Sequence, residues 1–170
     1  YLIDILKAME KVGSKSLVGA MYSYWPCQFE ITDKEAAWER SIEGMKEVAE
    51  AAESLGIECC QEVLNRYETY IITDCREGLE YCRRVGSENV NLLLDTFHMN
   101  IEEDNIPEAI RLAGRKLGHL HVGESNRKLP GMGSLPWRDI GRALRDIGYE
   151  KGVVMEPFLL QGGEVARDCK

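Results

Sequence analysis

Four side chains of metal-binding type stand at or just after the ends of short apolar runs. They are Glu62 in CCQEVLNRYE, Asp95 in NLLLDTFHMN, His121 in LGHLHVGES and Glu156 in GVVMEPF. An apolar run that stops at an acid or a histidine is how a buried parallel strand carries a functional group to the mouth of a barrel. A single run of this kind means little, because many strands end in a solvated acid. Four in succession predict one converging site.

The donor types indicate which metal such a site would bind. Two glutamates, an aspartate and a histidine offer mainly hard oxygen ligands and one nitrogen, which suits Mn²⁺, Co²⁺ or Mg²⁺ better than a metal that prefers thiolates. We expect Mn²⁺ first, with Co²⁺ and Mg²⁺ as alternatives. The net charge of −8 argues against a nucleic-acid partner, because neutralising phosphates needs a basic face.

The segments that must position these groups alternate between helix and strand. Hydrophobic spacing predicts helices over residues 1–12, 33–55, 73–86, 107–116 and from Pro136, and strands over residues 16–21, 57–63, 90–95, 117–122 and 152–156. Asp33 and Thr73 are the expected N-caps of the second and third helices. This order requires parallel strands joined by right-handed crossovers.

Two architectures satisfy that order, a doubly wound sheet and a barrel. The barrel is favoured because functional groups follow nearly every strand, whereas an open sheet gathers them at its switch point. A complete barrel needs about 250 residues. We therefore predict an α/β fold, a partial TIM barrel with about five of eight β/α units, forming a single domain over residues 1–170. The chain opens at Tyr1 within a helix, so we expect a piece of a longer protein that lacks the N-terminal units and the last helix.

The six cysteines contain no C-x-x-C pair, which speaks against a zinc ribbon or a redox motif. We expect reduced and mostly buried thiols in a cytoplasmic enzyme. No apolar run approaches the roughly 20 residues needed to cross a bilayer, so we expect no membrane association.

Several motifs together resemble a known family. The segments EVLNRYE, LLLDTFHMNIEED, GHLHVGESNR, LPWRDIGRALRDIGY and VVMEPF, in this order, are similar to the ketose 3-epimerases, the D-tagatose and D-psicose (D-allulose) 3-epimerase group of the xylose-isomerase-like barrels. The resemblance runs from about the first strand to the end of the chain. Tyr67 is one small departure, since the family often has phenylalanine at this position.

The resemblance implies roles for seven residues. Its metal ligands fall on Glu62, Asp95, His121 and Glu156, its substrate-binding groups on Glu68, His98 and Arg127, and its two proton-exchanging carboxylates on Glu62 and Glu156. Epimerising C3 of a ketose removes the proton alpha to the C2 carbonyl and returns one from the opposite face, which needs two carboxylates that exchange the roles of acid and base. The implied divalent cation would polarise the carbonyl and stabilise the cis-enediolate.

Simpler explanations exist for some of these residues. His119 shares a strand face with His121 but lies deeper, where a hydrogen-bonded core histidine is the favoured interpretation. His98 could be a loop residue beside a helix N-terminus, and Arg127 could form a surface salt bridge of little value. Residues 102–104 are interpreted as an acidic lead-in to the next helix. Tyr22 and Trp25 follow the first strand and could form an apolar wall for a sugar or a packed aromatic pair.

Other functions fit part of the pattern. An aldose–ketose isomerase would use similar metal chemistry at C1 and C2. A DNA-repair endonuclease of the same superfamily is disfavoured, because the chain has three histidines and an acidic balance. A truncated remnant that binds metal or a partner without catalysis is the alternative of another class. A small ketose is the expected substrate, and homo-oligomers are expected because a five-strand arc leaves two open edges.

Overall fold

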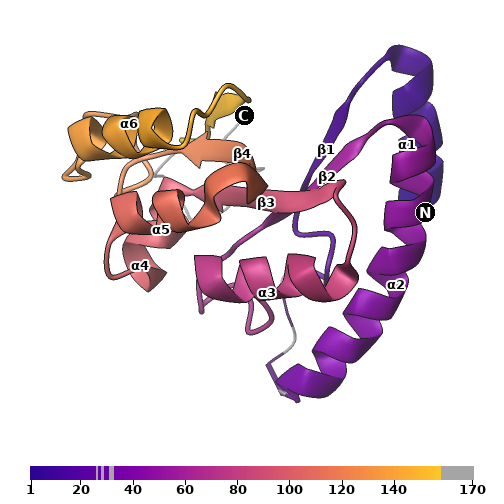
Figure 1. The fold of residues 1–170 in the computed structure, drawn as a ribbon. Coiled ribbons are helices and arrows are strands. Elements are labelled where there is room, and N and C mark those ends of the chain that lie inside the picture. The colour runs from indigo at the N-terminus through magenta and orange to yellow at the C-terminus, as the bar shows by residue number, and fades with distance from the viewer. Residues whose placement is uncertain (26, 28, 31–32, 158–170) are drawn as a thin grey trace, which may run out of the picture.

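A computed structural model describes residues 1–25, 27, 29–30 and 33–157 of the chain. Helices and strands alternate along it as the sequence predicts (Figure 1). The elements are α1 (Leu2–Val12), β1 (Ser16–Gly19), α2 (Lys34–Leu55), β2 (Glu58–Glu62), α3 (Cys75–Val85), β3 (Val90–Asp95), α4 (Thr96–Glu102), α5 (Ile106–Ala113), the 3₁₀ turn η1 (Gly114–Lys116), β4 (Leu117–Val122), α6 (Trp137–Asp146) and β5 (Val153–Met155).

The five strands form one sheet in the order β1-β2-β3-β4-β5, and each neighbouring pair is parallel. Consecutive strands thus lie side by side, and a helical connection separates each pair. Figure 1 shows the strands curving past one another with the helices around their outside. This is a partial TIM barrel, which confirms the predicted fold class and decides against the doubly wound sheet.

The two faces of the sheet carry different side chains. Residues of one face, such as Cys59, Leu92 and Leu94, belong to the buried cluster shared with the helices. The alternate residues of β2, β3 and β4 face the other way, because side chains repeat every two residues along a strand. This second face, the inside of the arc, carries Glu62 and Asp95 at the ends of β2 and β3. It also carries His121 on β4, so three candidate ligands share one face and one end of the sheet.

The helices that cover the outer face start and stop where local chemistry predicts. Asp33 caps α2 by accepting the Ala36 N–H, and Gly56 ends that helix with a φ of 61°. For α3 the predicted cap is wrong. Asp74 accepts the Glu77 N–H, whereas Thr73 lies one residue outside and donates its hydroxyl to the Glu77 carboxylate. The carboxylate is the stronger acceptor for an N-terminal N–H group, so it takes the capping position.

The short helix α4 was not foreseen from the sequence. It begins directly after β3 with no turn residue between them, and Asp95 is both the last residue of the strand and the N-cap of the helix. The predicted positions of the other elements agree with the structure to within a few residues. Strand β5 ends at Met155, so Glu156 lies just beyond it.

Five of the six cysteines lie in the described part of the chain, and all five are free thiols. Cys59, Cys60, Cys75 and Cys82 are buried, and burial raises the pKa of each thiol, so none of the four is an activated nucleophile. The prediction of reduced, mostly buried cysteines is confirmed for these residues, while Cys169 lies outside the described residues. Among the described helices, none is long and apolar enough to cross a membrane.

Candidate active site

Glu62, Asp95, His121 and Glu156 converge at the C-terminal end of the strands. Each offers one donor atom, and these four atoms lie within 4.8 Å of one another. The Nδ1 atom of His121 is 3.5 Å from Glu62 Oε1 and 3.6 Å from Glu156 Oε2. The register explains the closeness, because Asp95 on β3 stands directly opposite His121 on β4. The backbone N–H of Glu156 donates to Val122 O on β4, which brings the fourth member to the same edge.

The two carboxylate oxygens of Asp95 have different partners, one in a helix cap and one in the site. Its Oδ1 accepts the N–H of Phe97 at 2.7 Å and so caps α4. Its Oδ2 faces the other candidate groups and lies 3.1 Å from Arg127 Nη1. The side chain has no solvent exposure. A buried acid held by a helix N-terminus has a fixed orientation, which suits a group that must meet a ligand at one position.

Arg127 reaches into this cluster from the loop between β4 and α6. Its Nη1 atom contacts Asp95 Oδ2 and Glu156 Oε2, each at 3.1 Å. Its backbone φ is 59°, in the left-handed region that non-glycine residues seldom adopt. The buried carboxylate of Glu124 holds this loop, since it accepts the N–H groups of Gly131 and Leu135 and the indole N–H of Trp137. Glu124 was not singled out from the sequence, and its position two residues after a buried strand was the available signal.

His98 and Glu68 lie next to the acidic cluster. The His98 ring is almost fully buried on α4, with Nε2 3.9 Å from Asp95 Oδ2 and 3.3 Å from Arg127 Nη2. Glu68 Oε1 is 3.8 Å from the other ring nitrogen, and its Oε2 accepts the indole N–H of Trp25. The structure therefore places all seven predicted residues in one region and shows His98 within a helix, not in a loop.

Titration of these groups reflects how closely the acids are packed. Burial raises the pKa of Asp95 to about 7, and the Glu156 carboxylate adds to the rise while Arg127 opposes it. Burial disfavours the charged form of His121, but Glu156 and Glu62 outweigh it and raise the pKa of His121 to about 10. For His98, burial lowers the pKa. The clustered carboxylates thus create a site that favours protons, a guanidinium or another positive charge.

The donor set fits a divalent cation. Donors bound to one ion at roughly 2.0–2.6 Å lie at most roughly 5 Å apart, and the four atoms meet this condition. His121 Nδ1 is buried and makes no hydrogen bond of regular geometry among the described residues, and the oxygens beside it are those of Glu62 and Glu156, as expected of a nitrogen in one ligand set. Three carboxylates and one imidazole match the preference of Mn²⁺, Co²⁺ or Mg²⁺.

The simpler explanations fare differently. His119 lies beside His121 with ring centres 5.3 Å apart. It is only partly buried, and no hydrogen bond from a described residue reaches its ring, so the interpretation as a hydrogen-bonded core histidine is not supported. Tyr22 is buried and packs edge-on against Tyr81, whereas the Trp25 ring is 65% exposed. The two aromatic residues therefore do not form a mutual pair.

The expected acidic lead-in at residues 102–104 is replaced by specific contacts. Glu102 ends α4 and forms a bidentate pair with Arg66, and Glu103 accepts the backbone N–H of Cys75 at the start of α3. The cap of α5 is instead Asn105, whose side chain accepts the Glu108 N–H. These acids thus tie α4 to neighbouring segments.

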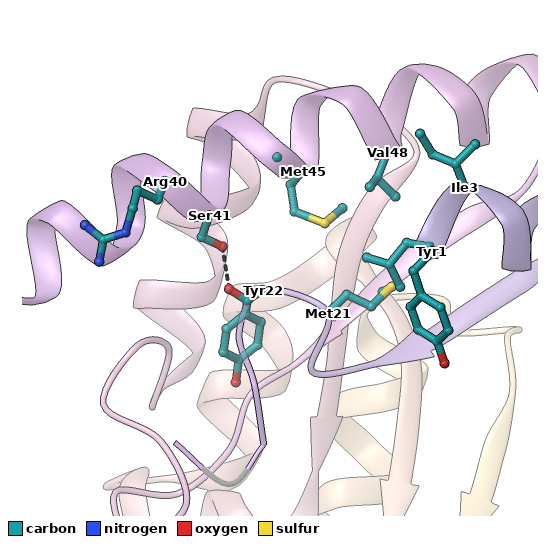
Figure 2. A pocket seen from close by; sticks show the side chains of 10 residues that line it. Tyr1, Ile3, Met21, Tyr22, Arg40, Ser41, Met45 and Val48 are labelled. Atoms are coloured by element: carbon teal, nitrogen blue, oxygen red, sulfur yellow. Dashed lines mark hydrogen bonds between the residues drawn. The ribbon is translucent and has the colours of Figure 1, made fainter. Parts of the chain in front are cut away.

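A cavity of about 310 Å³ lies elsewhere, between α1, α2 and the segment after β1. Figure 2 shows Met21, Met45 and Val48 around it and the Ser41 hydroxyl donating to the backbone carbonyl of Tyr22. The lining is mostly apolar and contains no acid or histidine, so this cavity has no groups for the chemistry discussed above.

Comparison with known proteins agrees with the fold. Residues 1–168 match the family described as xylose isomerase-like TIM barrel. A D-psicose 3-epimerase of Ruminiclostridium cellulolyticum is 52% identical over 171 residues, covering 100% of this chain and 58% of the relative. A D-psicose 3-epimerase of Agrobacterium fabrum is 47% identical, covering 97% of this chain and 57% of the relative.

A solved structure is similar over nearly the whole chain. The crystal structure of D-psicose 3-epimerase with D-tagatose from Clostridium cellulolyticum H10 superposes with a TM-score of 0.94 at 52% identity, covering 98% of this chain and 58% of the other. The chain belongs to the xylose isomerase-like TIM barrel family. Its strong relatives are ketose 3-epimerases, and it spans a little over half of their length.

Proposed function

We propose that this protein is a metal-dependent ketose 3-epimerase that interconverts free ketoses such as D-tagatose, D-fructose and D-psicose at C3. The observation that carries the proposal is the convergence of Glu62, Asp95, His121 and Glu156 within 4.8 Å, beside a buried histidine and an arginine. An isomerase needs acid–base groups and a means of stabilising negative charge, and this cluster offers both. The relatives named above are D-psicose 3-epimerases, which supports epimerisation as the class of reaction.

The same four residues would hold the cation, which we propose to be Mn²⁺ before Co²⁺ or Mg²⁺. When bound, a divalent cation would act as a Lewis acid toward the oxygens of the ketose. The chain itself prepares this position, because Asp95 is oriented by α4 and His121 is fixed by the register of β3 and β4.

Glu62 and Glu156 are the proposed acid–base pair. One carboxylate takes the proton from C3, the electrons of the C3–H bond form a C2–C3 double bond, and the carbonyl electrons move to O2. The other carboxyl group then returns a proton to the opposite face of C3, and the electrons move back to restore the C2 carbonyl. Both carboxylates flank His121 Nδ1 at nearly equal distances, which supports a two-sided arrangement. No oxidant or organic cofactor is consumed.

Arg127, His98 and Glu68 are the proposed substrate-binding groups. Arg127 presents donors where negative charge would develop on O2, so it would favour the transition state as well as binding.

Since five strands leave β1 and β5 at the sheet edges, we also propose that the chain self-associates. The free thiols support a cytoplasmic location, and the shared helical layer supports a single domain over residues 1–170.

The proposal is tested by incubating the protein, expressed from the full reading frame that encodes residues 1–170, with a ketose and Mn²⁺ in D₂O. We expect C3 epimers by chromatography and deuterium at C3 by NMR. Aldose products labelled at C1 or C2 would instead assign an aldose–ketose isomerase. A protein that binds Mn²⁺ but exchanges no carbon-bound proton would support the non-catalytic alternative. Repeating the assay with Co²⁺ and Mg²⁺ after chelation gives the metal preference.

A further inference from the structure

Asn65 is a buried residue that lies three positions beyond β2, and its side chain makes hydrogen bonds on both sides. Its Oδ1 accepts the backbone N–H of Tyr67 at 2.9 Å. A backbone N–H can only donate, so this contact identifies which end of the amide is the oxygen. The amide nitrogen Nδ2 must then face the opposite side, where His98 and Glu68 lie.

Both hydrogens of the Asn65 amide are used there. Nδ2 lies 2.7 Å from His98 Nδ1 and 3.0 Å from Glu68 Oε1. The backbone N–H of Asn65 also donates to His98 Nδ1, at 3.2 Å. Two donors from one residue thus converge on one ring nitrogen. A ring nitrogen that receives donors has no proton of its own, so the proton of the neutral His98 ring lies on Nε2.

The contact at Nε2 does not reverse this assignment. Nε2 lies 3.3 Å from Arg127 Nη2, but it cannot accept from the guanidinium, because a ring that accepts at both nitrogens would be an anion. His98 and Arg127 therefore stand side by side as two donors. Two adjacent donors define a position for an acceptor oxygen, which Asp95 Oδ2 approaches at 3.9 Å from Nε2. A carbonyl or hydroxyl oxygen of a substrate fits the same position.

We infer that Asn65 is a positioning residue that fixes His98 as the Nε2–H tautomer and orients Glu68 beside it. His98 then presents a donor and Glu68 an acceptor, which together match a carbonyl oxygen and a hydroxyl group on neighbouring carbons of a sugar. This deepens the proposed function: the identity of the sugar oxygens rests on that function, whereas the tautomer of His98 does not.

The tautomer is measured directly by long-range ¹H–¹⁵N NMR of the protein labelled with [¹⁵N]histidine. The variant His98→Gln assigns the signals by removing them. We expect the Nδ1 resonance of His98 at the shift of an unprotonated ring nitrogen and the Nε2 resonance at that of a protonated one. A spectrum with the proton on Nδ1 overturns the inference, whether or not the protein is active.

The role of the Asn65 side chain is tested by Asn65→Asp, which replaces the donor with an acceptor. We expect His98 Nδ1 to become protonated, so that its resonance moves to the shift of an N–H nitrogen. Asn91→Asp is the matched control, because the Asn91 amide also donates to a glutamate, Glu58, but at the other end of the sheet. The control should leave the His98 signals unchanged.

A second variant covers the case in which Asn65→Asp does not fold. Asn65→Ala keeps the backbone N–H and removes the amide, so we expect both His98 ring resonances to shift toward the average of the two tautomers. If the His98 ring resonances stay unchanged in either variant, the backbone N–H of residue 65 alone fixes the tautomer. That result would overturn the role of the Asn65 side chain. No substrate is present in these measurements, so failure of the epimerase assay and failure of this inference are separate results.

Discussion

The guanidinium carbon of Arg127 lies 3.8 Å from the centre of the Phe97 ring. Because the guanidinium stacks on the aromatic face, its in-plane donors point sideways, where they meet Asp95 and Glu156. Phe97 is the second residue of α4. The unpredicted helix therefore supplies both the platform for Arg127 and the capping N–H for Asp95.

This stacking predicts that lysine cannot replace Arg127. In Arg127→Lys the positive charge remains, but the flat contact with Phe97 and the simultaneous contacts with two carboxylates are lost. We expect kcat/KM for ketose epimerisation to fall roughly 100-fold. The control is the reverse exchange at the neighbouring exposed position, Lys128→Arg, which should leave kcat/KM unchanged. A decrease of less than about threefold in Arg127→Lys would show that only the charge matters.

Strand ends and helix spacing were enough to predict most of this architecture. Glu62, Asp95 and His121 stand at or next to the ends of three neighbouring parallel strands, so a correct alternation of elements already places them together. The sequence could not show how each side chain is held. Asp95 doubles as a helix cap, and that role depends on α4, which starts without any turn signal.

Residues that act through long-range contacts were the hardest to find. Glu124 and Asn65 are ordinary polar residues in loops, and their importance comes from hydrogen-bond partners that lie further along the chain or on irregular backbone. Likewise, Arg66 and Glu102 are 36 positions apart and form a bidentate pair that no local pattern announces. Single-sequence periodicity carries information about elements, not about which loop residue meets which helix.

The hydrogen bonds of Glu124 predict that the stability of the loop between β4 and α6 and the activity are linked. In Glu124→Ala the backbone N–H groups of Gly131 and Leu135 and the indole N–H of Trp137 lose their acceptor. The Leu135 N–H is the buried one, and a buried donor without a partner costs about 1–3 kcal/mol. We expect a lower free energy of unfolding in urea and a higher KM, because Arg127 sits in the same loop. Glu108→Ala is the control, since this exposed glutamate pairs with Arg111 at the surface. An unaltered KM in Glu124→Ala would separate this loop from substrate binding.

Metal binding predicts a gain in thermal stability. A cation that binds the folded chain at about 100 times its Kd contributes about 2.7 kcal/mol, which corresponds to roughly 5–10 °C in Tm for a chain of this size. We expect Mn²⁺ to raise Tm by this amount and EDTA to reverse it. The variant His121→Ala should lose the shift, whereas His119→Ala, a change on the same strand face, should keep it. A shift that survives His121→Ala would place the cation elsewhere.

If Glu62 and Glu156 act as a pair of acid and base, each of them is needed for proton exchange at C3. In Glu62→Gln or Glu156→Gln the amide cannot accept the proton, so we expect the rate of epimerisation to fall roughly 10²–10⁴-fold while the circular dichroism spectrum stays the same. Glu58→Gln is the matched control, because Glu58 lies on the same strand as Glu62 but pairs with Lys151 at its far end. Deuterium entering C3 at a near wild-type rate in either variant would show that the two-base assignment is wrong.

The sheet edges predict how residues 1–170 behave when expressed alone. Within the described residues, strands β1 and β5 each have one neighbour, so each presents backbone donors and acceptors without a strand partner along its other side. On β5 the side chains of Val153, Val154 and Met155 are 47–63% exposed, which adds apolar surface to the open edge.

We therefore expect this 170-residue chain to self-associate, with a second copy covering the edge, and to sediment faster than a 19.3 kDa monomer. Val154→Lys should shift the population toward the monomer, because a charge on an edge strand opposes pairing. The exposed Leu112, on helix α5 that packs against α3 and α6, provides the control Leu112→Lys. A monomer that melts cooperatively at high concentration would contradict this prediction.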